Sequence, residues 1–218
     1  MTQHEERSSR FQSRLRMPPT RLARGRAGRV AAASGGLILL SVTAALAISV
    51  LLPPGGSLPA PATTAATEPD LNGTVIEDTM VPFSIKDPSG AVVCAGKLQD
   101  RVVQSTKTGL FHFYYAIRET EGPGAVSRIV TSPFSKLTLR VAYRTDGLGT
   151  VPPHIAARSA APGTSVTFEL TDPPVSCARH EESRFMLIKT GLKAFHPGGA
   201  TKIFATTGAS VTVPTARP

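Results

Sequence analysis

The chain of 218 residues contains no tryptophan, a single asparagine (Asn72) and only two cysteines. It also lacks several motifs that mark enzyme families. It has no Gly-x-Ser-x-Gly elbow and no Walker or dinucleotide-binding glycine loop, and its five histidines form no HxH or HExxH ligand set. These absences remove the usual signatures of α/β-hydrolases, P-loop nucleotidases, dinucleotide-dependent enzymes and helical zinc proteases. We expect neither a cofactor nor a metal site.

Carboxylates are present, but they show no pairing pattern. Glycoside hydrolysis needs two carboxylates at a separation that the fold sets. The acidic residues available for this are Asp100, Asp146, Glu169 and Asp172, and nothing in the sequence pairs any two of them. Catalysis is therefore left open, and a non-enzymatic role is favoured.

Charge is distributed unevenly along the chain. The formal net charge is +9, and residues 1–29, with eight Arg, two Glu and no Lys, account for +6 of it. Residues 53–218 hold 16 Lys and Arg against 13 Asp and Glu, which gives only +3. No basic stripe in this part is interleaved with aromatic residues, so the sequence indicates no nucleic-acid partner. Residues 1–29 are predicted to be a basic cytoplasmic tail.

An uncharged apolar run of 23 residues spans 30–52. A helix of that length is about 34 Å long, enough to cross a hydrocarbon core of roughly 30 Å. Eight Arg precede the run and the first Lys after it is Lys86, so the positive-inside tendency places the N-terminus in the cytoplasm and the remainder outside. We predict one transmembrane helix over 30–52, a signal anchor whose partner is membrane lipid, in a single-pass protein of the cell membrane.

The alternative is a cleaved signal peptide and a secreted product, with translation starting at Met1 or at Met17. Small residues at the spacing of a signal-peptidase site occur at Ala45-Leu46-Ala47 and at Ala60-Pro61-Ala62. The apolar run is longer than the usual ~7–15 residues of a signal sequence, which favours the anchor. Both interpretations place residues 70–218 outside the cytoplasm.

Residues 53–69 contain five Pro and no periodic apolar pattern. Such a composition is typical of an extended, solvated spacer, so a linker is predicted here. The foldable part of the chain is then residues 70–218.

Within residues 70–218 the apolar residues alternate with polar ones. In 111–118 the odd positions are apolar while the even ones include His112 and Arg118, and 137–144 and 165–170 show the same period of two. This pattern is typical of strands with one face on a core and the other in water. Gly- and Pro-rich turns separate the candidate strands. The prediction is an all-β, antiparallel β-sandwich or jelly-roll-like domain.

Both cysteines, Cys94 and Cys177, lie in the part that we expect to be exported. An even number of cysteines outside the cytoplasm is most simply a disulfide. The alternative is a reactive thiol, because His180 is only three residues from Cys177. We predict a structural disulfide between Cys94 and Cys177.

One polar, glycine-rich loop is a candidate ligand site. It begins at the end of an expected strand with Tyr143 and Arg144, continues through Asp146, and is followed by Arg158 after a Pro-Pro pair. Binding residues are often carried by loops on a rigid scaffold. The plainer interpretation is a hairpin turn with a solvated Arg–Asp pair, which contributes at most about 1 kcal/mol.

Several segments between residues 95 and 195 resemble exported bacterial β-domain proteins of unknown function, some of which carry a PEP-CTERM sorting tail. The segments that carry the likeness are 102–105, 108–115, 153–159 and 183–190. This chain differs in ending with Pro-Thr-Ala-Arg-Pro rather than such a tail. The resemblance implies an extracellular β domain and assigns no reaction.

These observations support three hypotheses. The first is a membrane-tethered, extracytoplasmic, non-enzymatic domain for binding, adhesion or envelope structure, with an envelope glycan or a protein as ligand. The second is a β-sandwich hydrolase acting on cell-wall or extracellular polysaccharide. The third is an extracytoplasmic sensor. A cleft in which two carboxylates converge would separate the second from the first.

Overall fold

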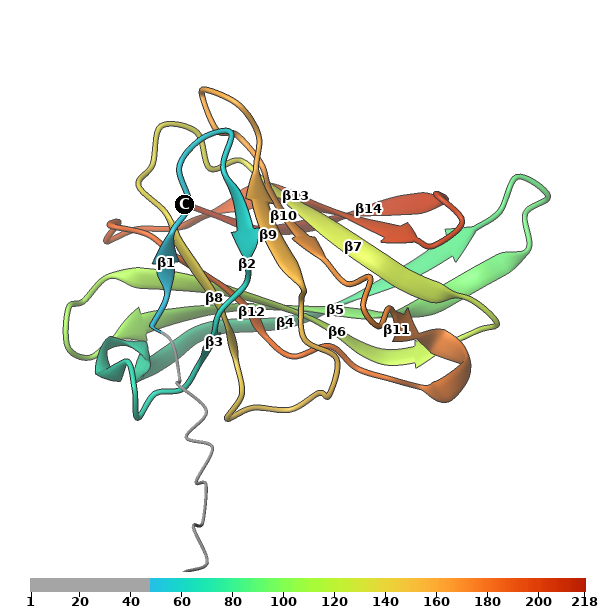
Figure 1. Ribbon diagram of the computed structural model, residues 1–218, viewed down its shortest axis with the longest axis horizontal. Helices are drawn as coiled ribbons and strands as arrows, with labels where there is room; N and C mark the ends of the chain where they lie inside the picture. Colours follow the sequence, from blue (N-terminus) through green and yellow to red (C-terminus); the bar gives the residue numbers. More distant parts are fainter. Residues whose placement is uncertain (1–47) are drawn as a thin grey trace, which may run out of the picture. The chain divides into compact units, whose positions relative to one another are not determined.

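The computed structural model describes residues 48–218, which form one compact unit built from two β-sheets (Figure 1). Among the described residues, strands hold 54% and helical turns 4%, so the predicted all-β class is confirmed. The strands are antiparallel except for one short parallel pairing, and the two sheets pack face to face as a β-sandwich. The segments 1–29 and 30–47, which include most of the predicted transmembrane helix, lie outside the described residues.

We call the first seven-stranded sheet sheet A. Its strands run in the spatial order β1 (Val50–Leu51), β8 (Arg140–Arg144), β12 (Met186–Lys189), β6 (Phe111–Glu121), β5 (Val92–Ser105) and β4 (Gly73–Lys86). A further strand, β3 (Ala62–Thr63), pairs in parallel with β8. The strand β4 therefore forms one edge of sheet A.

The second seven-stranded sheet, sheet B, faces the first. Its strands run in the order β14 (Ser210–Arg217), β13 (His196–Ala205), β7 (Ala125–Ser132), β10 (Val166–Glu169), β9 (Ile155–Arg158) and β2 (Ser57–Pro59). The short strand β11 (Val175–Ser176) also pairs with β7. Two short 3₁₀ turns, η1 (Pro69–Leu71) and η2 (Cys177–Arg179), complete the described elements.

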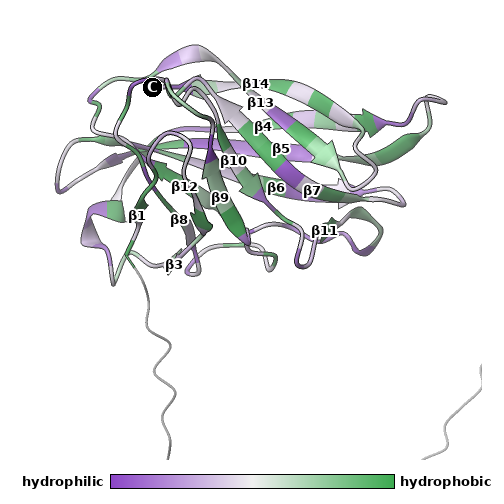
Figure 2. Ribbon diagram, turned by 45° about the horizontal axis from the view of Figure 1, so that its top comes forward, coloured by the Kyte–Doolittle hydropathy of each residue, from purple (hydrophilic) through white to green (hydrophobic). Residues whose placement is uncertain are grey.

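The main core lies between the two sheets and is built by the predicted alternation. Hydrophobic and hydrophilic residues alternate along many of the strands (Figure 2). On β6, Phe113 and Tyr115 point inward and are fully buried, and the ring of Phe113 meets that of Phe134 edge-on, with centroids 5.9 Å apart. Burial of each such aromatic side chain removes a large apolar surface from water, which is the main favourable contribution to folding.

The outer face of β6 differs from the prediction of a solvated face. His112 and Arg118, expected in water, are 1% and 3% exposed. A second apolar cluster covers this face, and its members include Leu71, Tyr114 and Phe185. Apolar and polar residues do alternate between the two faces of β6 as predicted. A layer of loops over sheet A, however, buries the polar positions as well.

The N-terminal segment is the largest correction to the predicted domain boundaries. Val50 pairs with Val141 of β8, and Leu52 is fully buried in the main core. Residues 53–69, predicted to be a solvated linker, instead contribute β2 and β3 to the two sheets. The prolines fit because these strands are short and β2 lies at a sheet edge, where a missing N–H does not interrupt a ladder. The domain therefore includes residues from Ser49 onward and does not begin at Asp70.

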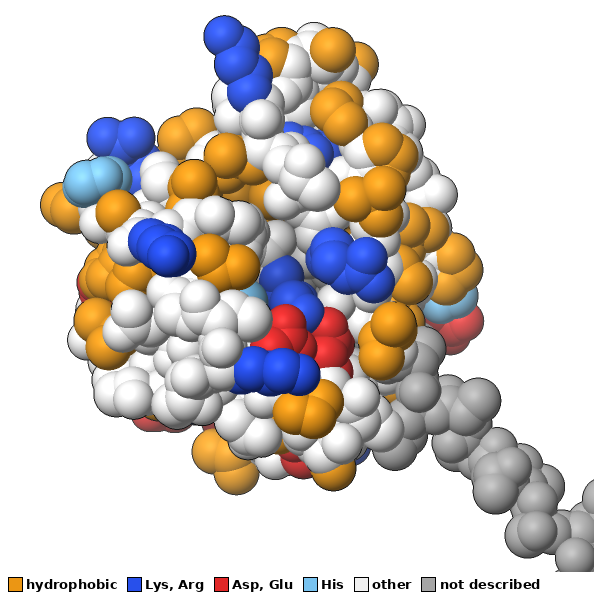
Figure 3. Space-filling model, turned by 90° about the vertical axis from the view of Figure 1, so that its left-hand side faces the viewer, with side chains coloured by type: hydrophobic (Ala, Val, Ile, Leu, Met, Phe, Trp, Pro, Cys, Tyr) orange, Lys and Arg blue, Asp and Glu red, His pale blue; other side chains and the backbone are white. Residues whose placement is uncertain are grey.

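A buried ionic network holds this segment on sheet A. The Glu68 carboxylate accepts hydrogen bonds from the Ser49 backbone N–H at 2.9 Å and from Lys189 of β12. Lys189 also pairs with Asp70 at 2.6 Å, and Arg140 donates to the Ser49 carbonyl. Burial works against the charge on Glu68, yet the bonds from Lys189 and Ser49 lower its pKa. Figure 3, which views the side of the domain where β1 lies, shows acidic side chains against basic ones near the centre of this face.

The disulfide between Cys94 and Cys177 is confirmed. Cys94 lies on β5 of sheet A, and Cys177 begins η2, directly after β11 of sheet B. The two Cα atoms are 5.8 Å apart and both residues are fully buried. The bond therefore joins the two sheets at one end of the sandwich and closes a separation of 83 residues.

The first prediction concerns this bond. Replacing both cysteines with alanine should destabilise the domain by up to about 4.5 kcal/mol, because an unfolded chain freed of such a long loop gains entropy. Thermal unfolding of the double variant measures the effect, with the reduced wild-type protein as the control. An unchanged melting temperature in both samples would contradict it.

Candidate functional site

A cavity of about 250 Å³ lies on the outer face of sheet A. Four parts of the chain meet there: the turn from η1 into β4, the outward side chains of β5 and β6, the loop after β8, and the residue before β12. We call it the outer pocket. Its polar lining includes Asn72, Arg101, Tyr114, Arg144 and Asp146.

The Arg144–Asp146 pair forms one wall of the outer pocket. The guanidinium donates from Nε to one carboxylate oxygen at 2.6 Å and from Nη2 to the other at 2.7 Å. Asp146 also accepts the backbone N–H of Ala65 at 2.9 Å. Burial opposes the charge on Asp146, but the bonds from Arg144 and Ala65 lower its pKa. The two-point geometry fixes the plane of the guanidinium.

The opposite wall is formed by Arg101 and Phe185. The guanidinium of Arg101 lies 4.7 Å from the centre of the Phe185 ring and bonds Asp78 at 2.7 Å. A second guanidinium, that of Arg118, also lies 4.7 Å from the ring centre. The hydrogen bond from Arg101 lowers the pKa of Asp78 despite partial burial. Phe185 is thus held by two cations, a favourable arrangement for an aromatic face.

Tyr114 lies between these walls, on the outer face of β6. Its ring meets Phe185 edge-on at 6.0 Å, and its hydroxyl accepts a long hydrogen bond of 3.5 Å from Arg144. Burial raises the pKa of Tyr114 to about 12, so the hydroxyl stays protonated at neutral pH. Each arginine that lines the pocket is matched by an aspartate, so the site presents many hydrogen-bonding groups with little net charge.

The structure brings together only part of the predicted ligand loop. Arg144 and Asp146 line the outer pocket. Tyr143, the neighbouring residue of β8, points the other way and packs against the main core. Arg158 lies on β9 of sheet B, where it donates to the carbonyls of Leu52, Phe134 and Gly163. Arg158 therefore braces the fold and is not part of this site.

Most residues of the pocket were not predicted from the sequence, among them Arg101, Tyr114 and Phe185. Arg101 and Tyr114 are adjacent because β5 and β6 pair in a register that sets them opposite each other. Phe185 enters from a segment about 70 residues further along the chain. The alternation that places Tyr114 on the outer face of its strand was the only signal available.

A second, smaller cavity of about 190 Å³ contains one of the acidic residues considered for catalysis. Asp100 of β5 points into the space between the sheets and lines this cavity together with Glu77 of β4. Glu169 and Asp172 line neither cavity. Asp100 is 1% exposed, and its Oδ2 accepts the backbone N–H of Ala216 at 2.6 Å. Burial, together with the charges of Glu77 and Asp78, raises its pKa to about 7.

The raised pKa of Asp100 leads to a prediction about pH. Because the folded pKa of about 7 exceeds the usual value of 3.8, folding takes up a proton between these two values. The contribution of Asp100 to stability is thus complete below about pH 4 and is lost as the pH rises towards 7. Asp100→Asn, which keeps an acceptor for the Ala216 N–H, should stabilise the protein at pH 8 by an amount on the order of a few kcal/mol.

The variant should change little at pH 4, where wild-type Asp100 is protonated in the folded state. Urea unfolding of both proteins across this range measures the difference. A stability difference that does not depend on pH would contradict the raised pKa.

Within residues 48–218, no helix is long and apolar enough to cross a membrane, and no group of three or more His, Cys, Asp or Glu side chains is arranged to hold a metal ion. Comparison of the chain with protein-family models, curated protein sequences and solved structures finds no match. The resemblance to exported bacterial β-domain proteins is thereby neither supported nor contradicted. What the domain does has to be inferred from its own geometry.

Proposed function

We propose that residues 48–218 form an extracytoplasmic, non-enzymatic binding domain whose outer pocket holds one unit of an envelope glycan. The observation that carries the proposal is the outer pocket itself, a concave site in which polar groups converge around an apolar floor. The disulfide and the N-terminal sequence support the location.

The location follows from redox chemistry. A fully buried disulfide that joins the two sheets is stable in an oxidising compartment, whereas the cytosol keeps thiols reduced. The basic residues 1–29 and the apolar run after them are the elements of an export signal. These independent features point to the same side of the membrane.

The choice of a glycan follows from the lining of the outer pocket. Arg101 and Arg144 offer N–H donors, Asp146 offers acceptor oxygens and Asn72, which is exposed, offers both. Sugar hydroxyls donate and accept in the same way, and the apolar side chains of Val75 and Val103 suit the C–H face of a sugar ring. The volume is below the ~300–1,000 Å³ of pockets that enclose a drug-sized ligand, so one sugar unit fits and the remainder of a glycan stays outside.

Two carboxylates do line the smaller cavity, which is the condition set for the hydrolase alternative. Asp100, however, is 1% exposed, and one of its oxygens is held by the Ala216 N–H. A polysaccharide chain has to pass between the two carboxylates of a glycosidase, together with a water molecule in the inverting class. A buried Asp100 offers no such passage, which favours binding over hydrolysis.

The start of the domain supports the secreted alternative alongside the membrane anchor. Ser49 is fully buried and Val50 is paired, so the end of the apolar run belongs to the folded domain, and the part of the run before Ile48, residues 30–47, is 18 residues long. Ala45-Leu46-Ala47 has the spacing of a signal-peptidase site and lies just before the buried Ser49 and the paired Val50. An uncharged, mainly apolar run of 18 residues is also within the length range of a membrane span, about 17–25 residues.

The glycan proposal predicts that the purified full chain binds a component of envelope polysaccharide or peptidoglycan on a glycan array. Combining Asn72→Ala with Arg101→Gln should weaken this binding by about tenfold or more, because two net hydrogen bonds contribute about 1–3 kcal/mol. Isothermal titration calorimetry with the glycan that binds on the array measures the change in affinity.

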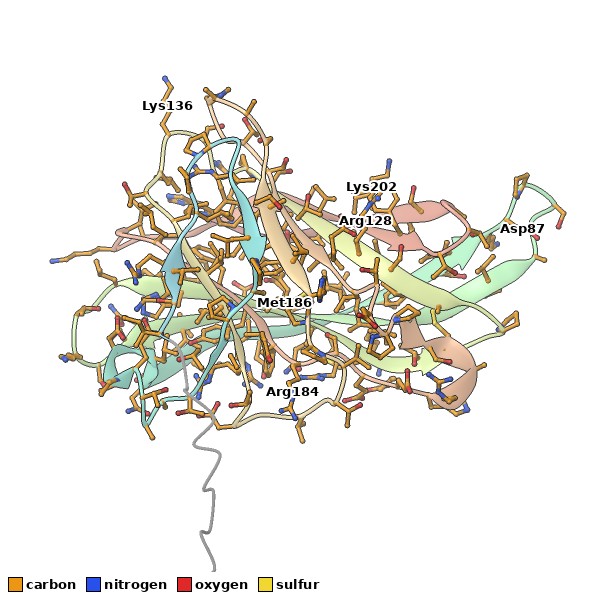
Figure 4. The ribbon with its side chains drawn as sticks, viewed as in Figure 1. Asp87, Arg128, Lys136, Arg184, Met186 and Lys202 are labelled. Carbon is orange, nitrogen blue, oxygen red and sulfur yellow. A yellow bond between two sulfur atoms is a disulfide. The ribbon has the colours of Figure 1, made fainter. Side chains whose placement is uncertain are left out.

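The matched control is Arg128→Gln. Arg128 and Lys202 lie side by side on the outer face of sheet B, both over the ring of Phe204 (Figure 4), so this variant removes the same charge from another surface. It should bind as the wild type does. Equal binding by all three proteins, or no binding to any envelope glycan, would refute the proposed site.

The export proposal predicts that a reporter enzyme fused after Pro218 is active only outside the cytoplasm. Mass spectrometry of the same fusion distinguishes a membrane-anchored chain from a secreted, cleaved product. An intact chain in the membrane fraction means an anchor, and a product beginning at Ile48 means a cleaved signal peptide. Reporter activity in the cytoplasm would exclude both.

A further inference from the structure

The smaller cavity has features that the glycan site does not explain. It opens between β4, the edge strand of sheet A, and the hairpin of β13 and β14 in sheet B, and Asp100 lies within it. Oδ1 of Asp100 has no hydrogen-bond partner among the described residues, although the side chain is almost completely buried. A buried polar atom without a partner is costly, and natural proteins rarely keep one without a reason.

A second carboxylate, that of Glu77, lines the same cavity. Asp100 pairs with Thr79 across β4 and β5, and Glu77 lies two positions before Thr79 on the same face of β4. Glu77 is therefore a diagonal neighbour of Asp100, within the reach of a long side chain. Burial is the main cause of the raised pKa of Asp100, and the negative charge of Glu77 adds to it. Among residues 48–218, Glu77 and Asp100 are the only ionisable residues that line the cavity, so it carries no balancing positive charge.

The walls of the cavity are mainly apolar. Pro197 and Pro214 come from the β13–β14 hairpin, and Val81 comes from β4. Between β13 and β14 the register shifts at Pro197 and Gly199, and Gly198 there has a φ of +95°. A side chain is rarely compatible with that conformation, and a Cβ on Gly199 would lie 2.6 Å from the Ala216 carbonyl oxygen. The β-bulge and its glycines therefore shape this wall of the cavity.

The ligand that fits has to be cationic and narrow. A divalent metal ion needs more ligands than two carboxylates, and the described residues contain no cluster of three metal-binding side chains. A primary ammonium group carries three N–H donors and one positive charge. It can donate to Asp100 Oδ1 and to Glu77 while an aliphatic chain lies against the prolines.

We propose that this cavity is a binding site for a primary alkylammonium group, with Asp100 at its base and Glu77 at its side. The ligand class is an aliphatic amine or the terminal amine of a lysine-like side chain. The site is separate from the outer pocket, because the two cavities share no lining residue. It does not depend on the glycan proposal.

The test is an NMR titration of the full chain at pH 8 with n-butylammonium chloride, followed at the backbone amide of Ala216. The wild type should show a saturable shift, since this amide bonds Asp100 directly. Asp100→Asn should weaken binding at least about tenfold, the loss expected when a charge-assisted bond is removed. Glu77→Gln should weaken it several-fold, and because Glu77 is only half-buried and the substitution keeps its shape, the variant should fold.

Two controls test whether binding requires the positive charge of the ligand and whether it occurs at this cavity. n-Butanol, which has the same chain without the charge, should cause no saturable shift at the same concentrations. Glu169→Gln, which removes an equal charge from β10 of sheet B, should bind butylammonium as the wild type does. An unsaturated wild-type response, equal binding of butanol, or unchanged affinity in both Asp100→Asn and Glu77→Gln would overturn the proposal.

Discussion

The ionic contact of Lys189 with Glu68 and Asp70 is the interaction on which the outer layer of the domain depends. A buried lysine is costly unless its charge is matched, and here two carboxylates from the N-terminal segment match it. This contact holds the segment that carries Leu71 over the outer face of sheet A. Without that layer, Tyr114 and Phe185 would lie on an open sheet surface, and the outer pocket would lose the wall formed by Leu71 and Asn72. The outer pocket is thus a product of the way the start of the domain folds back on β12.

Local patterns in the sequence were sufficient for the class of fold but not for its boundaries. The odd positions of 111–118 are apolar because one face of β6 meets the core, and this could be read directly. The start of the domain could not be predicted in this way. The proline content of residues 53–69 is typical of a spacer, yet β2 and β3 within this segment pair with strands of the two sheets. The disulfide was predictable because only one pairing of two cysteines exists. The burial of His112 was hidden, since the residues that cover it are distant in sequence.

The residues of the two cavities also divide into those that a local sequence pattern could predict and those that it could not. Arg144 and Asp146 lie two residues apart, so their pairing could be anticipated from the chain alone. Arg101 and Phe185 meet only because separate strands bring them together, and no local signal marks Asp100 as different from other acidic residues. Its environment depends on β14, whose Ala216 N–H donates a hydrogen bond to Asp100 on β5. Long-range register, rather than composition, therefore decides which ionisable groups acquire unusual properties.

The position of the disulfide also has a mechanical consequence. If the folded domain is pulled by its two ends, the stretch of chain between Cys94 and Cys177, whose sequence separation is 83, cannot be drawn out, because a covalent bond closes it. At about 3.4 Å per residue, this removes roughly 280 Å from the length that the chain can release under tension. The strands before β5 and after η2, which include the edge strands β1 and β14 and the inner strands β12 and β13, can be drawn out, whereas β6 to β11 lie inside the closed loop. A domain built in this way lengthens by a limited amount under load and then resists as a short covalent link.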